Sequence, residues 1–189
     1  HGKSSFTGEK INIEDYVEQL DTLTKNLKID KFHLVGFSIG SLIALNFASE
    51  FEKKINSLTL ISTTYKRNKK QRQEVIDRVN LAKLNKPISN LALKRWFSDD
   101  YLIKNPNIRT EFMKILNKDF DDQKNFIKAY ELFAYYEDKI EKIKKINTRT
   151  LIMTGSNDPG STPEMSKNLS KDIKNSTYKE INNGKHLCS

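Results

Sequence analysis

With 189 residues, 37% of them hydrophobic and 30% charged, the chain is long and apolar enough for one folded domain, which excludes extended disorder. A single cysteine, Cys188, and three histidines exclude a disulfide framework and a cluster of metal ligands, and no apolar run reaches the ~18 residues of a membrane span. The net charge of +9 lies mostly in residues 66–145, which contain 20 Lys and Arg and 12 Asp and Glu. Because no basic stripe with interleaved aromatic residues is evident there, this charge indicates a solvated surface rather than nucleic-acid binding.

The first third of the chain alternates between helical and strand patterns. Apolar residues at helical spacing predict an amphipathic helix over 12–29, with Asn12 as its N-cap and Asp15 at the capping-box position. Three further elements are expected in chain order: a buried strand over 31–37, a central helix over 39–50 that is apolar nearly all round, and a second strand over 55–62.

Residues 66–146 differ in character, because they are highly charged and show several helical patterns but no strand. Pro87 and Pro106 break this stretch into pieces. Strand alternation then resumes, and the expected elements are a strand over 149–154, a helix near 163–173 and a strand near 176–181. The alternation predicts an α/β fold with a mostly parallel sheet. The expected parts are a core part over 1–65, a helical insertion over 66–146 and a second core part over 147–189.

The sharpest local signal is Gly36-Phe37-Ser38-Ile39-Gly40, a G-x-S-x-G motif between a predicted strand and a predicted helix. A serine on so tight a turn is held in a strained backbone geometry and projects its hydroxyl above the sheet edge. Glycines two residues to either side let the chain turn without side-chain clashes. The N–H of Ile39 then lies where a negative oxygen would develop, so the motif predicts Ser38 as a nucleophile and Ile39 as an oxyanion donor.

A nucleophilic serine needs a base, and the base needs an acid to orient it, in the chain order serine, acid, histidine for this motif. Asp158 follows the strand expected over 149–154, and His186 follows the strand expected near 176–181. Both therefore lie past the carboxyl ends of strands, where open α/β sheets build their sites. The residue types, their order along the chain and their placement after predicted strands together predict a catalytic triad of Ser38, Asp158 and His186.

The other reactive side chains are interpreted as structural. His33 lies inside a predicted strand, where a hydrogen-bonded histidine is the usual finding. Cys188 has no turn of the nucleophile type around it and is not expected to act as a nucleophile. Nothing in the sequence requires a metal ion or an organic cofactor.

These residues resemble the α/β-hydrolase superfamily. Phe32 to Gly40 resembles the family's "hlvGxSxG" stretch, His1 to Ser4 its "RGHGxS" turn, and Gly155 to Asp158 its "G-x-x-D" acid turn. The resemblance implies the α/β-hydrolase fold, a mostly parallel sheet flanked by helices, with residues 66–146 as a helical cap insertion. It also implies a longer protein, whose first strands would precede His1, whose final helix would follow the histidine, and whose missing part would supply a second oxyanion N–H.

Within the superfamily, the chain is similar to small-molecule hydrolases such as 3-oxoadipate enol-lactonase and the aminoacrylate-hydrolase group. The residues that carry this likeness are Arg95-Trp96-Phe97, Asp158-Pro159-Gly160-Ser161-Thr162-Pro163 and His186-Leu187-Cys188. A cation beside an aromatic ring in the cap would suit a carboxylate-bearing lactone or ester, which makes Arg95 and Trp96 candidate substrate contacts. Arg95 also fits a packing or surface role.

The combined prediction is a serine hydrolase that cleaves a small-molecule ester or lactone and resembles the enol-lactonases. One alternative is a hydrolase-like protein that binds a ligand with little turnover; others are a peptidase, a thioesterase, a C–C hydrolase or a cofactor-free haloperoxidase. A third reading is a basic interaction module over 66–145, whose binding to nucleic acid would weaken with salt. The expected partner is a small molecule rather than nucleic acid or membrane, for a cytoplasmic monomer or homo-oligomer.

Overall fold

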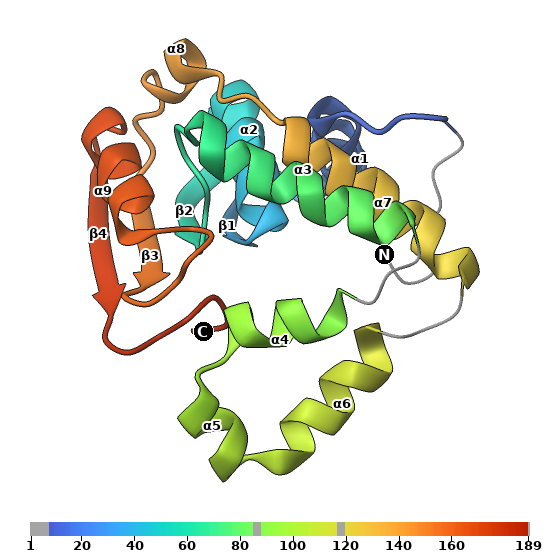
Figure 1. Ribbon diagram of the computed structural model, residues 1–189. Coiled ribbons are helices and arrows are strands. Elements are labelled where there is room, and N and C mark those ends of the chain that lie inside the picture. The colour runs from blue at the N-terminus through green and yellow to red at the C-terminus, as the bar shows by residue number, and fades with distance from the viewer. Residues whose placement is uncertain (1–7, 85–87, 117–119, 189) are drawn as a thin grey trace. The chain divides into compact units, whose positions relative to one another are not determined.

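The computed structural model describes residues 8–84, 88–116 and 120–188 (Figure 1). The chain divides into two compact units, which are treated separately below. The helical unit comprises His1–Ile11 and Arg67–Tyr136, and the sheet unit comprises Asn12–Lys66 and Glu137–Ser189. The division into core, cap and core expected from the sequence stays a prediction.

Four parallel strands form the sheet, in the spatial order β1-β2-β3-β4, which confirms the predicted parallel α/β arrangement. The strands are β1 (Phe32–Phe37), β2 (Ile55–Ile61), β3 (Thr150–Gly155) and β4 (Ser176–Ile181). The register pairs Gly36 with Leu60, Leu60 with Ile152, and Ile152 with Tyr178, and it shifts once, between Phe32 and His33 at the start of β1. Because all four strands point the same way, their carboxyl ends meet at one edge.

The helices of the sheet unit are α1 (Ile13–Asn26), α2 (Ile39–Phe51), the 3-10 turn η1 (Glu52–Lys54), α8 (Ile140–Ile143) and α9 (Pro163–Asp172). Helices α1, α2 and α9 lie close to the ranges that the sequence predicts, whereas η1 and α8 were not predicted as separate elements. Helix α2 packs on β1 and β2, α9 packs on β3 and β4, and α1 packs against α2 (Figure 1). The backbone N–H of Asn12 donates to the Asp15 carboxylate at 2.7 Å, as expected for a capping box.

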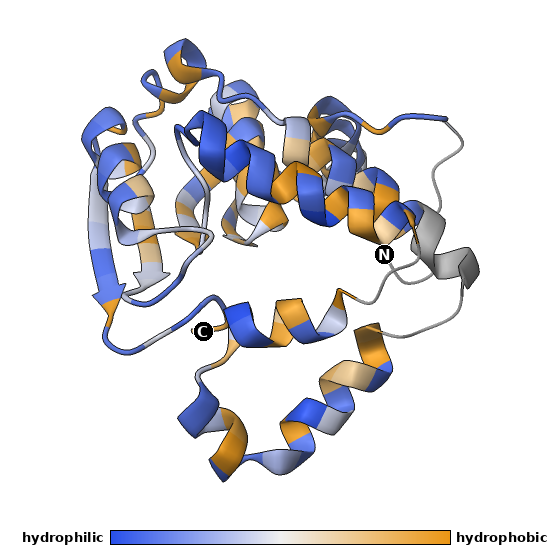
Figure 2. Ribbon diagram, in the orientation of Figure 1, coloured by the Kyte–Doolittle hydropathy of each residue, from blue (hydrophilic) through white to orange (hydrophobic). Residues whose placement is uncertain are grey.

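One hydrophobic cluster unites the two helices that flank the sheet with its inner strands. Leu45 of α2, Leu60 of β2, Ile152 of β3 and Leu169 of α9 are each fully buried in it. Strand β4 contributes less, since Figure 2 shows it as largely hydrophilic. A polar outermost strand discourages pairing with another chain.

Strand β1 departs from the fully buried strand that the sequence predicts. His33 and Val35 are exposed, and Val35 keeps 61% of its surface accessible. The physical reason is the two-residue period of a strand, which turns these side chains to the face opposite Leu34, the residue that packs on the core. The His33 ring lies 2.7 Å from the Ser57 hydroxyl, in agreement with a structural histidine.

The helical unit contains no strand in the part that the structure describes, as the sequence predicts. Its helices are α3 (Lys69–Lys83), α4 (Ser89–Trp96), α5 (Asp99–Lys104), α6 (Pro106–Leu116) and α7 (Phe120–Tyr135). Val75, Val79 and Ala134 form a small buried core between α3 and α7. Pro106 opens α6 at the first helical position, where proline is favoured, and Pro87 lies outside the described residues. None of the helices described has both the length and the apolar character that crossing a bilayer requires.

A polar cluster of buried Tyr65, exposed Lys66 and half-buried Asp172 ties α9 to the segment that follows β2. The Tyr65 hydroxyl donates to the Asp172 carboxylate at 2.7 Å, and the Lys66 ammonium lies 2.6 Å from the same oxygen. These hydrogen bonds, the one from Lys66 first, hold the pKa of the Asp172 carboxyl below its ordinary value. Asp172 therefore remains ionised to a lower pH in the folded protein than in the unfolded chain.

Candidate active site

The G-x-S-x-G motif forms the predicted sharp turn between β1 and α2. Ser38 has φ 54° and ψ −121°, a backbone conformation that residues with a Cβ rarely adopt. Its backbone N–H donates to the carbonyl of Ile61 at 3.0 Å, which extends the pairing of β1 with β2 into the turn. The strained residue is thus fixed by the sheet on one side and by the start of α2 on the other.

The two motif glycines have different roles. A Cβ on Gly36 would lie 2.4 Å from the carbonyl oxygen of Gly40 and 2.7 Å from the Cα of Ser41, so glycine is required for α2 to approach β1. A Cβ on Gly40 would meet no atom within 4 Å among the described residues. The expectation that both glycines avoid side-chain clashes is therefore confirmed at Gly36 and wrong at Gly40, because the first turn of α2 directs an added Cβ away from the other residues that the structure describes.

Asp158 lies in the turn of residues 155–161, here called the acid turn, which follows β3. Its side chain is fully buried, and its Oδ1 accepts hydrogen bonds from the backbone N–H groups of Gly160 at 2.9 Å and Ser161 at 3.0 Å. Hydrogen bonds of this kind fix the orientation of the carboxylate. They also leave Oδ2 free to accept from the histidine.

His186 lies in residues 182–188 after β4, here called the histidine loop, and bridges the other two predicted residues. Its Nδ1 lies 2.8 Å from Oδ2 of Asp158, and its Nε2 lies 3.0 Å from the hydroxyl oxygen of Ser38. A carboxylate only accepts, so Nδ1 carries the proton and Nε2 is left to accept from the serine hydroxyl. The structure therefore brings together all three residues that the sequence predicts, within one unit.

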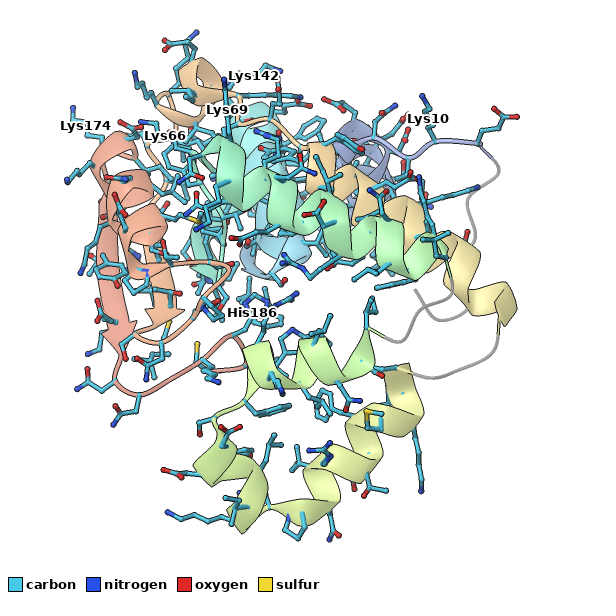
Figure 3. The ribbon with its side chains drawn as sticks, in the orientation of Figure 1. Lys10, Lys66, Lys69, Lys142, Lys174 and His186 are labelled. Atoms are coloured by element: carbon cyan, nitrogen blue, oxygen red, sulfur yellow. The ribbon has the colours of Figure 1, made fainter. Side chains whose placement is uncertain are left out.

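The position of His186 relative to the sheet is clear in Figure 3. The side chain lies past the carboxyl ends of the strands, whereas Lys142 and Lys174 of the same unit lie at the opposite edge. The ring of Phe37, at the middle of the motif, lies 5.3 Å from the imidazole, centroid to centroid. This separation is within the range of a packed aromatic pair, so Phe37 contacts the imidazole.

The predicted oxyanion donor, Ile39, is the first residue of α2. A first helical residue has no intrahelical acceptor for its N–H, and the helix dipole adds positive potential there. The arrangement can therefore stabilise a negative oxygen formed beside Ser38. The turn expected at His1 to Ser4 lies outside the described residues.

Arg95 and Trp96 lie in the helical unit, at the end of α4. The Trp96 ring packs edge to face on Phe112, with 6.0 Å between centroids, and both predicted residues are half-buried. The contact between Trp96 and Phe112 lies within the helical unit, and the substrate-binding role of Arg95 and Trp96 stays a prediction.

Histidine, cysteine, aspartate and glutamate do not gather in any group of three or more that would suit a metal ion within the described residues. Cys188 lies in the histidine loop, and its sulfur is 3.7 Å from the hydroxyl oxygen of Ser62.

Two contacts that the motifs do not identify hold the histidine loop at the sheet edge. The carbonyl of Gly184 accepts from the N–H of Asn157 at 2.8 Å, and the carbonyl of His186 accepts from the Ser62 hydroxyl at 3.0 Å. Gly155 makes the first contact sterically feasible, because a Cβ there would lie 2.3 Å from the Gly184 oxygen. The one sequence signal for Ser62 is its position directly after a strand of the same parallel sheet.

Comparison with known proteins adds family evidence to this geometry. A family model described as alpha/beta hydrolase fold matches residues 1–188. Two curated proteins of Acinetobacter baylyi are similar in sequence. One is (E)-2-((N-methylformamido)methylene)succinate hydrolase, 26% identical over 100% of this chain and 71% of its own length. The other is 3-oxoadipate enol-lactonase 1, 28% identical over 86% of this chain and 59% of its own length.

Solved structures agree on the fold. The crystal structure of the enol-lactonase from Burkholderia xenovorans matches with a TM-score of 0.86 at 21% identity, covering 99% of this chain and 70% of that one. This likeness supports the arrangement of strands and helices described above.

Proposed function

Because this chain belongs to the α/β-hydrolase fold family and is an enzyme of that family, we propose that it is a serine hydrolase that cleaves an ester or lactone bond of a small molecule. The observation that carries the proposal is the hydrogen-bonded chain from Ser38 through His186 to Asp158, with 3.0 and 2.8 Å between the joined atoms. Each of these three residues has one role in the proposed acyl transfer.

In the proposed mechanism, the Ser38 oxygen attacks the substrate carbonyl while Nε2 of His186 takes the hydroxyl proton. The Asp158 carboxylate stabilises the imidazolium that forms, and the N–H of Ile39 donates to the developing oxyanion. His186 then returns the proton to the leaving oxygen, which departs as an alcohol or stays attached as the opened lactone. In the second half of the cycle His186 deprotonates a water molecule, which attacks the acyl carbon, and the proton then passes from His186 to the departing Ser38 oxygen.

The names of the relatives support a proposal for the substrate class. The names of the two curated relatives refer to a succinate and to 3-oxoadipate, both carboxylates. We propose a substrate that bears a carboxylate near the scissile bond, with residues 66–146 selecting it and with Arg95 as the cation and Trp96 as the aromatic contact. The proposed setting is the cytoplasm, with no nucleic-acid partner.

Steady-state hydrolysis by the full-length protein tests the proposal. We expect turnover of short acyl esters of p-nitrophenol and of small lactones, and a fall in kcat of ~10⁴-fold or more in Ser38→Ala and in Asp158→Asn. Ser57→Ala and His33→Gln are matched controls, because both residues lie on the strands of the same unit and hydrogen-bond each other. A folded protein that hydrolyses none of these compounds, or whose Ser38→Ala variant keeps its rate, refutes the proposal.

The carboxylate preference is tested separately. Arg95→Gln is expected to raise KM for a carboxylate-bearing ester and to leave KM for the matched neutral ester unchanged. Arg109→Gln, on α6 of the same helical unit, is the control for loss of one positive charge. Equal effects of the two substitutions on both esters would rule out Arg95 as a substrate contact.

A further inference from the structure

Ser62 directly follows β2 and is buried, with 1% of its surface exposed. Its backbone N–H donates to the Met153 carbonyl at 2.9 Å, which continues the β2–β3 ladder past the last paired residue. Its φ of 50° lies in the left-handed region, an unusual conformation for a residue with a Cβ. The sheet therefore holds the Ser62 backbone in place independently of the histidine loop.

The Ser62 side chain reaches across to the histidine loop. Its hydroxyl donates to the backbone carbonyl of His186 at 3.0 Å, and its oxygen lies 3.7 Å from the Cys188 sulfur. A serine hydroxyl has one proton, and here that proton goes to the carbonyl, so the thiol of Cys188 supplies the donor for the second contact. The two partners together fix the direction of the Ser62 O–H bond.

We infer that Ser62 is a positioning residue, which fixes the backbone of His186 from the β2 side so that Nε2 stays within reach of the Ser38 hydroxyl. This inference rests on the proposed function and deepens it. The other side of the loop is fixed separately, through the bond from Asn157 N–H to the Gly184 carbonyl. Ser62 adds a hydrogen bond on the histidine itself, at the residue whose ring must keep its place.

The geometry explains why such an anchor matters during turnover. Nε2 of His186 takes a proton from Ser38 and returns it to a leaving oxygen, so it must hold a hydrogen-bonding distance to two different atoms. Without the Ser62 hydroxyl, the loop samples positions in which Nε2 is out of reach. One lost hydrogen bond predicts a fall in kcat of about three- to tenfold. KM is expected to stay unchanged, because the Ser62 side chain is buried and its hydroxyl donates to the protein backbone.

Two substitutions separate positioning from folding. Ser62→Ala removes the hydroxyl and keeps the Cβ in the left-handed conformation, whereas Ser62→Gly removes the hydroxyl and relaxes that conformation. The glycine variant is therefore expected to unfold at a higher urea concentration than the alanine variant, yet both should lose the same factor in kcat. Ser166→Ala is the matched control, because the Ser166 hydroxyl is fully buried on α9 and has no hydrogen-bond partner among the described residues.

A spectroscopic measurement reports on the histidine directly. The proton shared between Nδ1 of His186 and Asp158 gives a low-field resonance in proton NMR when it is protected from exchange. We expect this resonance in the wild type and in Ser166→Ala, and we expect it broadened by faster exchange in both Ser62 variants.

The outcomes distinguish the two claims. A folded wild type without hydrolase activity refutes the proposed function and the inference with it. If the wild type is active, three results would refute the inference alone. These are an unchanged kcat in both Ser62 variants, losses of kcat that follow the stability of each variant rather than the missing hydroxyl, and an unaltered NMR signal in both variants.

Discussion

Exchanging each motif glycine for alanine should have opposite effects on stability, although the two positions frame the same serine. In Gly36→Ala the new methyl would lie 2.4 Å from the Gly40 oxygen, 2.7 Å from the Ser41 Cα and 2.8 Å from the Ala44 Cβ. In Gly40→Ala the methyl would meet no described atom within 4 Å.

The size of each effect follows from these distances. An ordinary contact of a Cβ begins near 3.4 Å, so α2 must move about 1 Å away from β1 to admit the methyl at Gly36. The helix carries fully buried Leu42, Leu45 and Phe47, so this movement loosens the core and should cost about 3 kcal/mol, the upper end for overpacking. Gly40 lies within α2, where alanine is favoured over glycine by up to ~1 kcal/mol.

Equilibrium unfolding in urea, followed by circular dichroism, measures both changes. The Gly36→Ala midpoint should fall well below the wild-type value, and the Gly40→Ala midpoint should equal or exceed it, with unchanged slopes. Equal midpoints for Gly36→Ala and the wild type, or a larger loss in Gly40→Ala than in Gly36→Ala, would refute the steric reasoning.

Three further predictions concern the acid turn and α9. Gly155→Ala places a methyl 2.3 Å from the backbone of the histidine loop, so it should lower kcat sharply and destabilise the protein by about 1–3 kcal/mol; wild-type kinetics and wild-type urea unfolding would contradict this. Thr154→Val removes the buried donor that lies 2.8 Å from the Ser161 carbonyl and should cost about 1–3 kcal/mol in urea unfolding, whereas an unchanged midpoint would show that this bond is dispensable. Asp172→Asn should reduce the pH dependence of stability, because the Lys66 hydrogen bond lowers the pKa of the Asp172 carboxyl. Its contribution is complete above the unfolded pKa of about 4 and is lost as pH falls through the lower folded value. Thermal melts from pH 6 to pH 3 check this, and parallel curves for variant and wild type would argue against it.

Strong periodic patterns allowed the elements of the sheet unit to be predicted closely. The helix predicted over 39–50 is α2 over Ile39–Phe51, and the strand predicted near 176–181 is β4 over Ser176–Ile181. Helix α2 is bounded by a local signal that a single sequence carries, the G-x-S-x-G turn before it. The prediction of a buried β1 was wrong at His33 and Val35, because hydropathy does not report which face of a strand a helix covers.

The triad could be predicted by type and order, but its supporting contacts divide into two classes. The N–H groups that hold Asp158 belong to Gly160 and Ser161, within the same turn, and an aspartate followed by turn residues predicts such bonds. The bond from Ser62 to His186 joins residues 124 apart in the chain. No local pattern encodes that bond, since it exists only once the sheet has brought the ends of β2 and β4 to one edge.

The central claim, that Ser38 is the nucleophile, is tested most directly by reacting the full-length protein with a fluorophosphonate and mapping the adduct by mass spectrometry. We predict one adduct on Ser38, absent in Ser38→Ala and formed far more slowly in His186→Gln, because the imidazole activates the hydroxyl. A folded protein that forms no adduct, or that carries it on another serine, would contradict the claim.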